Sequence, residues 1–502
     1  MQNESKFKLL PGIFVYVTVL MLFCAYSSPL LNVIGIDSSV FRVMGRAMCE
    51  GKIMYRDVFD HKGFYIYVLN ALAVLMTGKS MAGIFIVECV FMLLCAVTVY
   101  AVLSVYADEK RSFIGTQIFL MFALLHGTWE GGNFTEEYGL LFQIFAVYLL
   151  VEDDGKFLCL YMFLQGVCAG IVICLRPNIV MMWASIALIA GYEMLRQKKF
   201  GRLAGNIAAG IAGVAAGIAP AVVYAVMTDS ISDMMFGTFG YNFMYLSAGE
   251  DGKFSLFAAI LRMCRILKPR GISITLLLSA IAVSSFLMLK KRRNFLSVKY
   301  YFAMLFMTLV SVALSGRVYG HYYMSLVPFC IPFVYWAVSK TKSDWYRPAV
   351  FIVIILTALT VARCPSGLRW IIGRQNVFFD DFVKYNEPYY SENERVLITG
   401  IFPRLYNELG VIPQEKYFYI PSNGYEKFPE PRDSQAASIL SGLNDVIIIV
   451  RRKGEDDIYP ETGKSREIRE VLERQYDLLY YRDELYYNDS LNAAMYGKKR
   501  GQ

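Results

Sequence analysis

Eleven long apolar runs divide the chain, and they constrain its fold more than any other feature of the sequence. They cover about residues 10–34, 81–106, 112–128, 135–151, 157–175, 177–195, 203–228, 272–289, 299–316, 321–339 and 348–362. Roughly 20 apolar residues span the hydrocarbon core of a bilayer as an α-helix. Hydrophobic residues make up 56% of the 502 residues, more than a soluble chain of this length carries. The sequence therefore predicts a multi-span α-helical membrane protein.

Short basic loops predict the orientation of these helices, because Lys and Arg are retained on the cytoplasmic side. The basic clusters at 6–8, 110–111, 196–202, 290–293 and 340–347 all fall at inner ends if the N-terminus is cytoplasmic and all eleven runs cross. A further apolar run, 64–76, is only about 20 Å long as a helix, so we expect an interfacial helix there. We expect a multi-pass protein of the cell membrane with about eleven transmembrane helices.

The character of the chain changes after residue 363. Residues 364–502 are polar, with β-like runs at 395–399, 417–420, 445–450 and 478–481 and helix-like segments such as 465–474. This alternation predicts a small α/β domain, which eleven crossings place outside the cell. We therefore expect a transmembrane domain over 1–363 and an extracytoplasmic α/β domain over 364–502. The latter has no GxGxxG or P-loop fingerprint, and we expect no nucleic-acid partner.

Cysteine and histidine spacing does not indicate a metal site. The ten cysteines lie mostly inside apolar runs and form no CxxC pair. The three histidines, His61, His126 and His321, lack the HxxxH or HExxH spacing of a helical zinc site. We expect no metal site, and a divalent metal stays open as the alternative.

Ionisable residues gather at the predicted outer ends of the spans. They are Asp37, Asp60, His61, Lys62, His126, Glu130, Glu136, Glu137, Arg176, Arg317 and His321. Ionisable groups near the membrane interior are functional-site candidates by default. Their location at one interface favours chemistry on a lipid-linked substrate over a transport pathway through the bilayer centre.

Several of these residues also have a purely structural interpretation. Asp37 either ends the first helix in solvent or opens a reactive polar loop. Glu136 and Glu137 follow Thr135, and they either stabilise a helix N-terminus through the helix dipole or belong to the site. Arg176 either snorkels to the interface or binds an anion.

Two predicted outer loops are rich in cations, against the orientation rule. The cations are Arg42, Arg46, Lys52, Arg56 and Lys62 in loop 37–80, and Lys253, Arg262, Arg265, Lys268 and Arg270 in loop 229–271. Either long loops count weakly in that rule, or these cations face an anion such as a lipid phosphate at the outer leaflet.

The first outer loop resembles that of the GT-C glycosyltransferases. The resemblance is carried by Asp37-x3-Phe41, by Gly51 and by the run Tyr-Arg-Asp-x-Phe-Asp-His-Lys-Gly from Tyr55 to Gly63. Looser motifs lie at Gly131–Tyr138, Arg176–Asn178 and Gly316–Tyr323, and the resemblance covers about residues 10–340. The most similar branch contains the protein O-mannosyltransferases, the aminoarabinose transferases and bacterial homologues of the lipopolysaccharide galacturonosyltransferase type.

The resemblance implies a polyprenyl-phosphate sugar donor, a cavity open to the outside and inversion at the anomeric carbon. Carried over, Asp37 matches the acid that activates the acceptor, and Lys62 matches the lysine that meets the lipid phosphate. We therefore expect a hexosyl- or pentosyltransferase acting on a glycan, lipid or protein acceptor at the outer face, with no nucleotide or redox cofactor. The expected site residues are Asp37, Glu136 and Glu137 for catalysis, and Arg56, Asp60, His61, Lys62, Arg176, Arg265, Arg317, His321 and Tyr322 for substrate or lipid phosphate.

Two other classes of function stay open. A lipid-linked sugar flippase or transporter would use broken helices in symmetric pairs near the midplane, and the sequence shows no such pair. A cell-envelope assembly scaffold would act mainly through residues 364–502.

Overall fold

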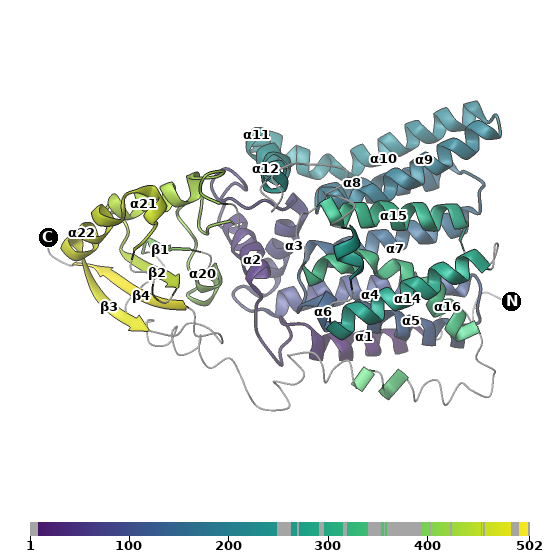
Figure 1. Ribbon diagram of the computed structural model, residues 1–502, viewed down its shortest axis with the longest axis horizontal. Helices are drawn as coiled ribbons and strands as arrows, with labels where there is room; N and C mark the ends of the chain where they lie inside the picture. Colours follow the sequence, from purple (N-terminus) through teal and green to yellow (C-terminus); the bar gives the residue numbers. More distant parts are fainter. Residues whose placement is uncertain are drawn as a thin grey trace. The chain divides into compact units, whose positions relative to one another are not determined.

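The chain forms two compact units in a computed structural model (Figure 1). The first comprises Met1–Asn32, Ile84–Tyr224 and Gly249–Gly373, and the second comprises Val33–Gly83, Ala225–Ala248 and Arg374–Gln502. The structure describes residues 9–247, 263–268, 271–290, 296–314, 319–339, 353–355, 357–358, 394–400, 403–421, 424–452, 454, 457–482 and 491–499. The first polar loop therefore belongs to the same unit as the C-terminal part of the chain.

The first unit is a bundle of apolar helices (Figure 1). Its helices are α1 (Leu10–Cys24), α4 (Ala82–Ser104), α5 (Glu109–Ala123), α6 (His126–Trp129), α7 (Thr135–Asp153), α8 (Cys159–Ile173), η1 (Pro177–Val180), α9 (Met181–Arg196), α10 (Phe200–Met227), α14 (Gly271–Lys290), α15 (Val298–Leu314), η3 (Gly320–Cys330) and α16 (Ile331–Ser339). Each apolar run predicted between residues 81 and 339 coincides with helical structure. The run 348–362 lies mostly outside the described residues.

Five helical segments of the described residues are long and apolar enough to cross a bilayer. They are Ala82–Ser104, Pro177–Arg196, Phe200–Met227, Gly271–Lys290 and Gly320–Ser339. Shorter apolar helices are Leu10–Cys24, Phe64–Thr77, Cys159–Ile173 and Val298–Leu314. Apolar side chains such as Ile211 and Met227 of α10 are exposed, which suits contact with lipid. The chain is a helical membrane protein, and the count of eleven crossings stays a prediction.

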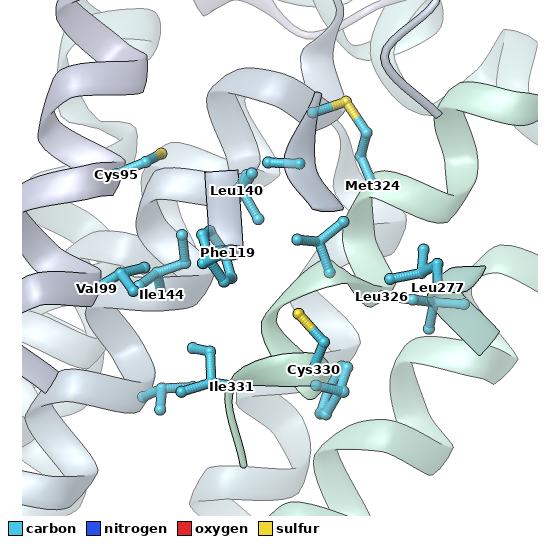
Figure 2. Packing of buried hydrophobic residues seen from close by; sticks show 14 of the residues in the cluster. Cys95, Val99, Phe119, Leu140, Ile144, Leu277, Met324, Leu326, Cys330 and Ile331 are labelled. Atoms are coloured by element: carbon cyan, nitrogen blue, oxygen red, sulfur yellow. The ribbon is translucent and has the colours of Figure 1, made fainter. Parts of the chain in front are cut away.

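One apolar core joins the helices of the first unit. Figure 2 labels Cys95 and Val99 of α4, Phe119 of α5, Leu140 and Ile144 of α7, Leu277 of α14, Met324, Leu326 and Cys330 of η3, and Ile331 of α16. Each of these side chains is at most 1% exposed. Close contact of this kind, and not the hydrophobic effect, holds helices together in lipid. Glycine allows close contact between α8 and α10, because a Cβ on Gly213 would clash with the carbonyl oxygen of Phe163.

The first helix is shorter than the apolar run that predicts it. α1 ends at Cys24, and turns follow in residues 25–31. Pro29 lacks a backbone N–H and disfavours the helical conformation at Ser28. The sequence predicts Asp37 at the outer end of the first span, and the structure differs. Asp37 lies in the first turn of a separate helix, α2 (Ile36–Cys49).

The polar loop of the second unit lies between two helices that pack side by side, α2 and α3 (Phe64–Thr77) (Figure 1). Their contact is close, since a Cβ on Gly45 would lie 2.7 Å from the backbone nitrogen of Ala71. The predicted helix 64–76 is thus present as α3, and its interfacial location stays a prediction. Three further segments of this unit are α11 (Ile231–Met235), the π-helical turn η2 (Phe236–Gly240) and α12 (Tyr241–Ser247).

The C-terminal part of the second unit contains a four-stranded mixed sheet. Its strands are β1 (Val396–Ile398), β2 (Val446–Arg452), β3 (Tyr476–Arg482) and β4 (Leu491–Lys498), in the order β1-β2-β4-β3. Only β1 and β2 are parallel, with Val396 opposite Val446. The helical segments are α20 (Arg404–Glu408), α21 (Glu430–Leu440), η6 (Pro460–Thr462) and α22 (Ser465–Gln475).

The core of this sheet confirms the predicted α/β character. Ile447 and Ile449, two residues apart on β2, face the same side and pack with Ile439 of α21 and Ile468 of α22. Three of the four predicted β-like runs coincide with strands, whereas 417–420 forms none. The predicted domain boundary after residue 363 lies outside the described residues.

Candidate functional site

The predicted site residues fall into two groups, one in each unit. Asp37, Arg56, Asp60, His61 and Lys62 lie in the second unit, and Glu136, Glu137, Arg176, Arg265, His321 and Tyr322 lie in the first. Arg317 lies outside the described residues, as do Lys253, Arg262 and Arg270 of the second basic loop.

Asp60 is the buried anchor of the first polar loop. Its carboxylate is 1% exposed and accepts hydrogen bonds from the hydroxyls of Tyr67 at 2.9 Å and Tyr419 at 2.5 Å. Burial alone would raise the pKa of this carboxyl. Its interactions with His61 and Lys62 outweigh that effect and hold the pKa of Asp60 well below its usual range. Asp60 is therefore a carboxylate at neutral pH.

His61 lies between the carboxylate of Asp60 and the ammonium of Lys62. The Lys62 nitrogen is 3.2 Å from Nε2 of His61, and Oδ1 of Asp60 is 3.1 Å from Nδ1. An ammonium group only donates hydrogen bonds, so Nε2 is the accepting nitrogen and the ring proton is on Nδ1. Burial, together with the charge of Lys62, lowers the pKa of His61. The ring is therefore neutral at pH 7, with one defined tautomer.

The backbone of this loop is held as well. The hydroxyl of Tyr55 donates to the carbonyl oxygen of Lys62 at 2.9 Å, and the amide of Asn242 in α12 donates to that of His61 at 2.9 Å. These bonds fix the point from which the Lys62 side chain projects. Its ammonium has three donors, of which His61 takes one.

Asp37 differs from Asp60 in having no such partners. Its side chain is half-buried in the first turn of α2, and its carboxylate has no hydrogen-bond or ion-pair partner in the part of the chain that the structure describes. Its charge nevertheless acts on His61 and Tyr419. A carboxylate without a donor is available to accept a proton.

Two of the cations predicted in this loop are buried and bind backbone carbonyls. Arg42 and Arg46, both on α2, are 3% and 6% exposed. Arg46 donates to the carbonyl oxygens of Tyr406 at 2.9 Å and Gly410 at 2.5 Å, at the end of α20, and Arg42 donates to that of Lys79. Carbonyls at helix C-termini favour cations, so the structure itself accounts for these two charges.

Arg56 and Arg265 are both exposed. Arg56 lies 3.2 Å from the carboxylate of Asp57 and donates to the carbonyl oxygen of Thr228 at 3.0 Å. Arg265 belongs to a short helical stretch, 263–267, in the first unit. Lys62 differs from both, because it is not exposed and its ammonium contacts the ring of His61.

The predicted residues of the first unit meet in a compact charge cluster. Glu136 pairs with Arg176 through one carboxylate oxygen and accepts the hydroxyl of Thr135 at 2.8 Å through the other. Nδ1 of His321 is 2.7 Å from Glu130, and Nε2 is 3.9 Å from Glu136. The structure thus brings together Glu136, Arg176 and His321, which come from α7, the turn before η1, and η3.

Aromatic rings complete this cluster. The guanidinium of Arg176 lies 4.1 Å from the ring centre of Tyr322. The ring of His321 stacks on Phe134 at 4.3 Å and on Tyr319 at 5.7 Å. Sequence reasoning did not select Phe134 or Tyr319, although both lie inside the looser motifs of the first unit.

Glu137 faces a different neighbourhood from Glu136. It is 1% exposed and accepts the backbone N–H of Asn133 at 2.6 Å. Asn133 has a φ of 59° and follows two glycines that also have positive φ, so this carboxylate stabilises a left-handed loop. The buried Glu88 of α4 accepts the hydroxyl of Ser27 nearby in the same unit.

The described residues contain no group of three or more His, Cys, Asp or Glu side chains that could hold a metal ion. The two histidines of the candidate site, His61 and His321, each face a carboxylate in their own unit.

One protein family matches the chain over most of its length. The profile of the putative competence-induced protein Ccs4 N-terminal domain matches residues 2–346. The chain belongs to this family. No curated protein matches this Ccs4-family chain in sequence.

Solved structures share the fold. ArnT from Cupriavidus metallidurans bound to undecaprenyl phosphate aligns with a TM-score of 0.64 and 10% identity, over 97% of this chain and 98% of ArnT. Its apo state gives the same values. The arabinofuranosyltransferase AftD from Mycobacteria aligns with a TM-score of 0.52 and 12% identity, over 99% of this chain and 40% of AftD. The Ccs4-family chain therefore has a GT-C-like fold, which the resemblance implied.

Proposed function

We propose that this protein is an integral membrane glycosyltransferase, which transfers a sugar from a polyprenyl-phosphate-linked donor to a hydroxyl group at the outer face of the membrane. The observation that carries the proposal is that the carboxylate of Asp37, which has no partner among the described residues, and the held ammonium of Lys62 occur in one unit. The fold supports it, because ArnT has the same fold and its solved structure is bound to undecaprenyl phosphate. The acceptor is a glycan, a lipid or a protein.

Asp37 is the proposed general base. An acceptor hydroxyl is a poor nucleophile, so a carboxylate must take its proton as the oxygen attacks the anomeric carbon. The bond between that carbon and the phosphate oxygen breaks, the electron pair leaves with the lipid phosphate, and the configuration at the carbon inverts. The proton ends on Asp37 and the negative charge on the phosphate.

Lys62 is the proposed partner of that phosphate. Its neighbour is the neutral ring of His61, and no carboxylate among the described residues forms a direct ion pair with its ammonium. Two of its three N–H donors are left for phosphate oxygens. A donor placed where negative charge develops lowers the barrier to departure.

The charge cluster of the first unit is proposed to organise the ends of its helices. Glu136, Arg176 and His321 already hold one another. Tyr319, which is 40% exposed beside His321, offers a ring surface for a sugar or lipid. Glu136 and Glu137 stay second candidates for the catalytic acid.

We also infer a multi-pass arrangement with a cytoplasmic N-terminus and an extracytoplasmic domain over 364–502. The reason is that the short basic loops all lie on the cytoplasmic side if the chain crosses the membrane eleven times. An alkaline phosphatase reporter fused after Gln502 should be active, and one fused after Arg293 should be inactive. An inactive fusion after Gln502 would contradict the eleven crossings and the outer placement of the domain.

The test of the proposed function is transfer by purified, detergent-solubilised protein. A polyprenyl-phosphate donor carrying a radiolabelled sugar should release polyprenyl phosphate and label an envelope fraction. A flippase would instead move the donor across the bilayer of proteoliposomes without consuming it. A scaffold would do neither.

A further inference from the structure

The C-terminal part of the chain contacts the first polar loop of the same unit at successive residues. The backbone N–H of Phe59 donates to the carbonyl oxygen of Lys416 at 2.9 Å. One residue later, Asp60 accepts the hydroxyl of Tyr419. The ammonium of Lys416 is 3.1 Å from Asp233 of α11. Residues 416–420 therefore lie along the chain immediately before Lys62.

Tyr419 acts on the oxygen of Asp60 that faces His61. That oxygen, Oδ1, is 2.5 Å from the Tyr419 hydroxyl and 3.1 Å from Nδ1 of His61. Hydrogen bonds to an ionised acceptor are short and roughly twice as strong as neutral ones. The bond from Tyr419 therefore keeps this carboxylate charged and turned toward the ring.

His61 passes that constraint to Lys62. With its proton on Nδ1, the ring offers the Nε2 lone pair to the ammonium. If Asp60 loses its charge or turns away, the proton can move to Nε2. The N–H at Nε2 would then face the N–H donors of the Lys62 ammonium, with no acceptor between them, and the ammonium would leave its position.

We propose that Tyr419 is a positioning residue for Lys62, acting through Asp60 and His61, so that the C-terminal segment 416–420 controls the cation that meets the donor phosphate. The proposal rests on the proposed function for the identity of the ligand of Lys62. A partner or modification that displaces this segment would regulate donor binding from the C-terminal part of the chain.

The chain offers a matched control two residues away. Tyr417 lies in the same segment, and its ring packs on Phe59 at 5.3 Å and on Phe428 at 5.6 Å. Its hydroxyl has no hydrogen-bond partner in the described part of the chain. Tyr417→Phe and Tyr419→Phe therefore remove the same atom, and only the second removes a bond to Asp60.

The first test needs no ligand. Because the chain has three histidines, solid-state NMR of protein labelled with ¹⁵N in the histidine rings can resolve His61, with His61→Gln for assignment. The wild type and Tyr417→Phe should show a protonated Nδ1 and an unprotonated Nε2. Tyr419→Phe should show a mixture of tautomers. Asp60→Asn should show the same mixture, and it replaces Tyr419→Phe if that variant folds poorly. Unchanged His61 signals in both variants, or equal changes in Tyr417→Phe, would overturn the proposal.

The second test measures affinity for undecaprenyl phosphate in detergent. Tyr419→Phe should raise the Kd about three- to tenfold, Tyr417→Phe should leave it unchanged, and Tyr419→Phe should add nothing in an Asp60→Asn background. If the wild type binds, Lys62→Ala does not and Tyr419→Phe binds normally, the positioning role is wrong and the proposed function stands. If the wild type does not bind, the proposed function fails and the histidine signals still decide the role of Tyr419.

Discussion

Both units place a histidine among charged side chains, but among the described residues the two clusters differ in how many of their charges have partners. In the first unit, His321 lies between Glu130 and Glu136, and Glu136 also pairs with Arg176. The side chain of Glu136 is 2% exposed. Each charge of this cluster already has a partner of opposite charge or a ring.

The second unit arranges similar residues differently. His61 has an acid on one side, Asp60, and a cation on the other, Lys62. Among the described residues, the acid accepts hydrogen bonds from two tyrosine hydroxyls, the cation contacts a neutral ring, and the nearby Asp37 has no partner. The comparison teaches that a buried charge cluster is not in itself evidence of a reactive site, and it is the reason why we place the proposed chemistry on the groups that lack saturating partners among the described residues.

The largest structural effect should follow from breaking the pair in the first unit. Arg176→Ala leaves the buried carboxylate of Glu136 without its cation, which costs about 3–5 kcal/mol, so the thermal-unfolding midpoint should fall sharply. The exposed pair of Lys299 and Glu193 in the same unit is a control, because Lys299→Ala should cost no more than about 1 kcal/mol. A stable Arg176→Ala protein with weakened donor binding would instead make Arg176 a substrate residue.

The cation of the second unit should matter for binding and not for stability. Lys62→Ala removes charge-assisted bonds to the phosphate, so the Kd for undecaprenyl phosphate should rise roughly 10- to 150-fold, with a weaker dependence on salt. Lys52→Ala is the control, since Lys52 lies in the same loop and bonds to Gln414 at 3.2 Å. Equal affinities of the two variants would show that Lys62 is a surface charge.

The smallest effect should appear as a pH dependence of stability. The pKa of His61 is lowered in the folded protein by burial and by Lys62, so between pH 7 and pH 5.5 the unfolded chain binds a proton that the folded chain does not. As the pH falls over this range, the free energy of unfolding should therefore decrease by at most about 1.4 kcal/mol because of this group. His61→Gln should not show this part of the decrease. Asp60, whose pKa is lowered in the folded protein, changes the free energy of unfolding only below about pH 5. Identical losses in both proteins would contradict the neutral His61.

The sequence predicted the helices well and the environment of the site only in part. Apolar runs of sufficient length predicted the bundle because a helix is the form such runs take in lipid. Strand β4 was missed because Leu491–Lys498 is rich in small and polar residues and lacks β-branched ones.

Long-range contacts explain what local patterns did not predict. Asp60 and Tyr419 are 359 residues apart, and Arg46 and Gly410 are 364 apart. No spacing rule connects such positions. The sequence therefore identified the loop through its motif, but the tyrosine that holds Asp60 and the carbonyls that bind Arg46 required the structure.

The central claim is that Asp37 of the second unit, and not the paired acids of the first, performs the chemistry. The direct test compares initial rates of sugar transfer from a polyprenyl-phosphate donor by Asp37→Asn and Glu136→Gln, each normalised to folded protein. Asp37→Asn should lose about 10²- to 10⁴-fold in turnover while its Kd for undecaprenyl phosphate stays unchanged, and Glu136→Gln should keep most of its turnover. Near-normal transfer by Asp37→Asn together with loss of transfer by Glu136→Gln would contradict the claim.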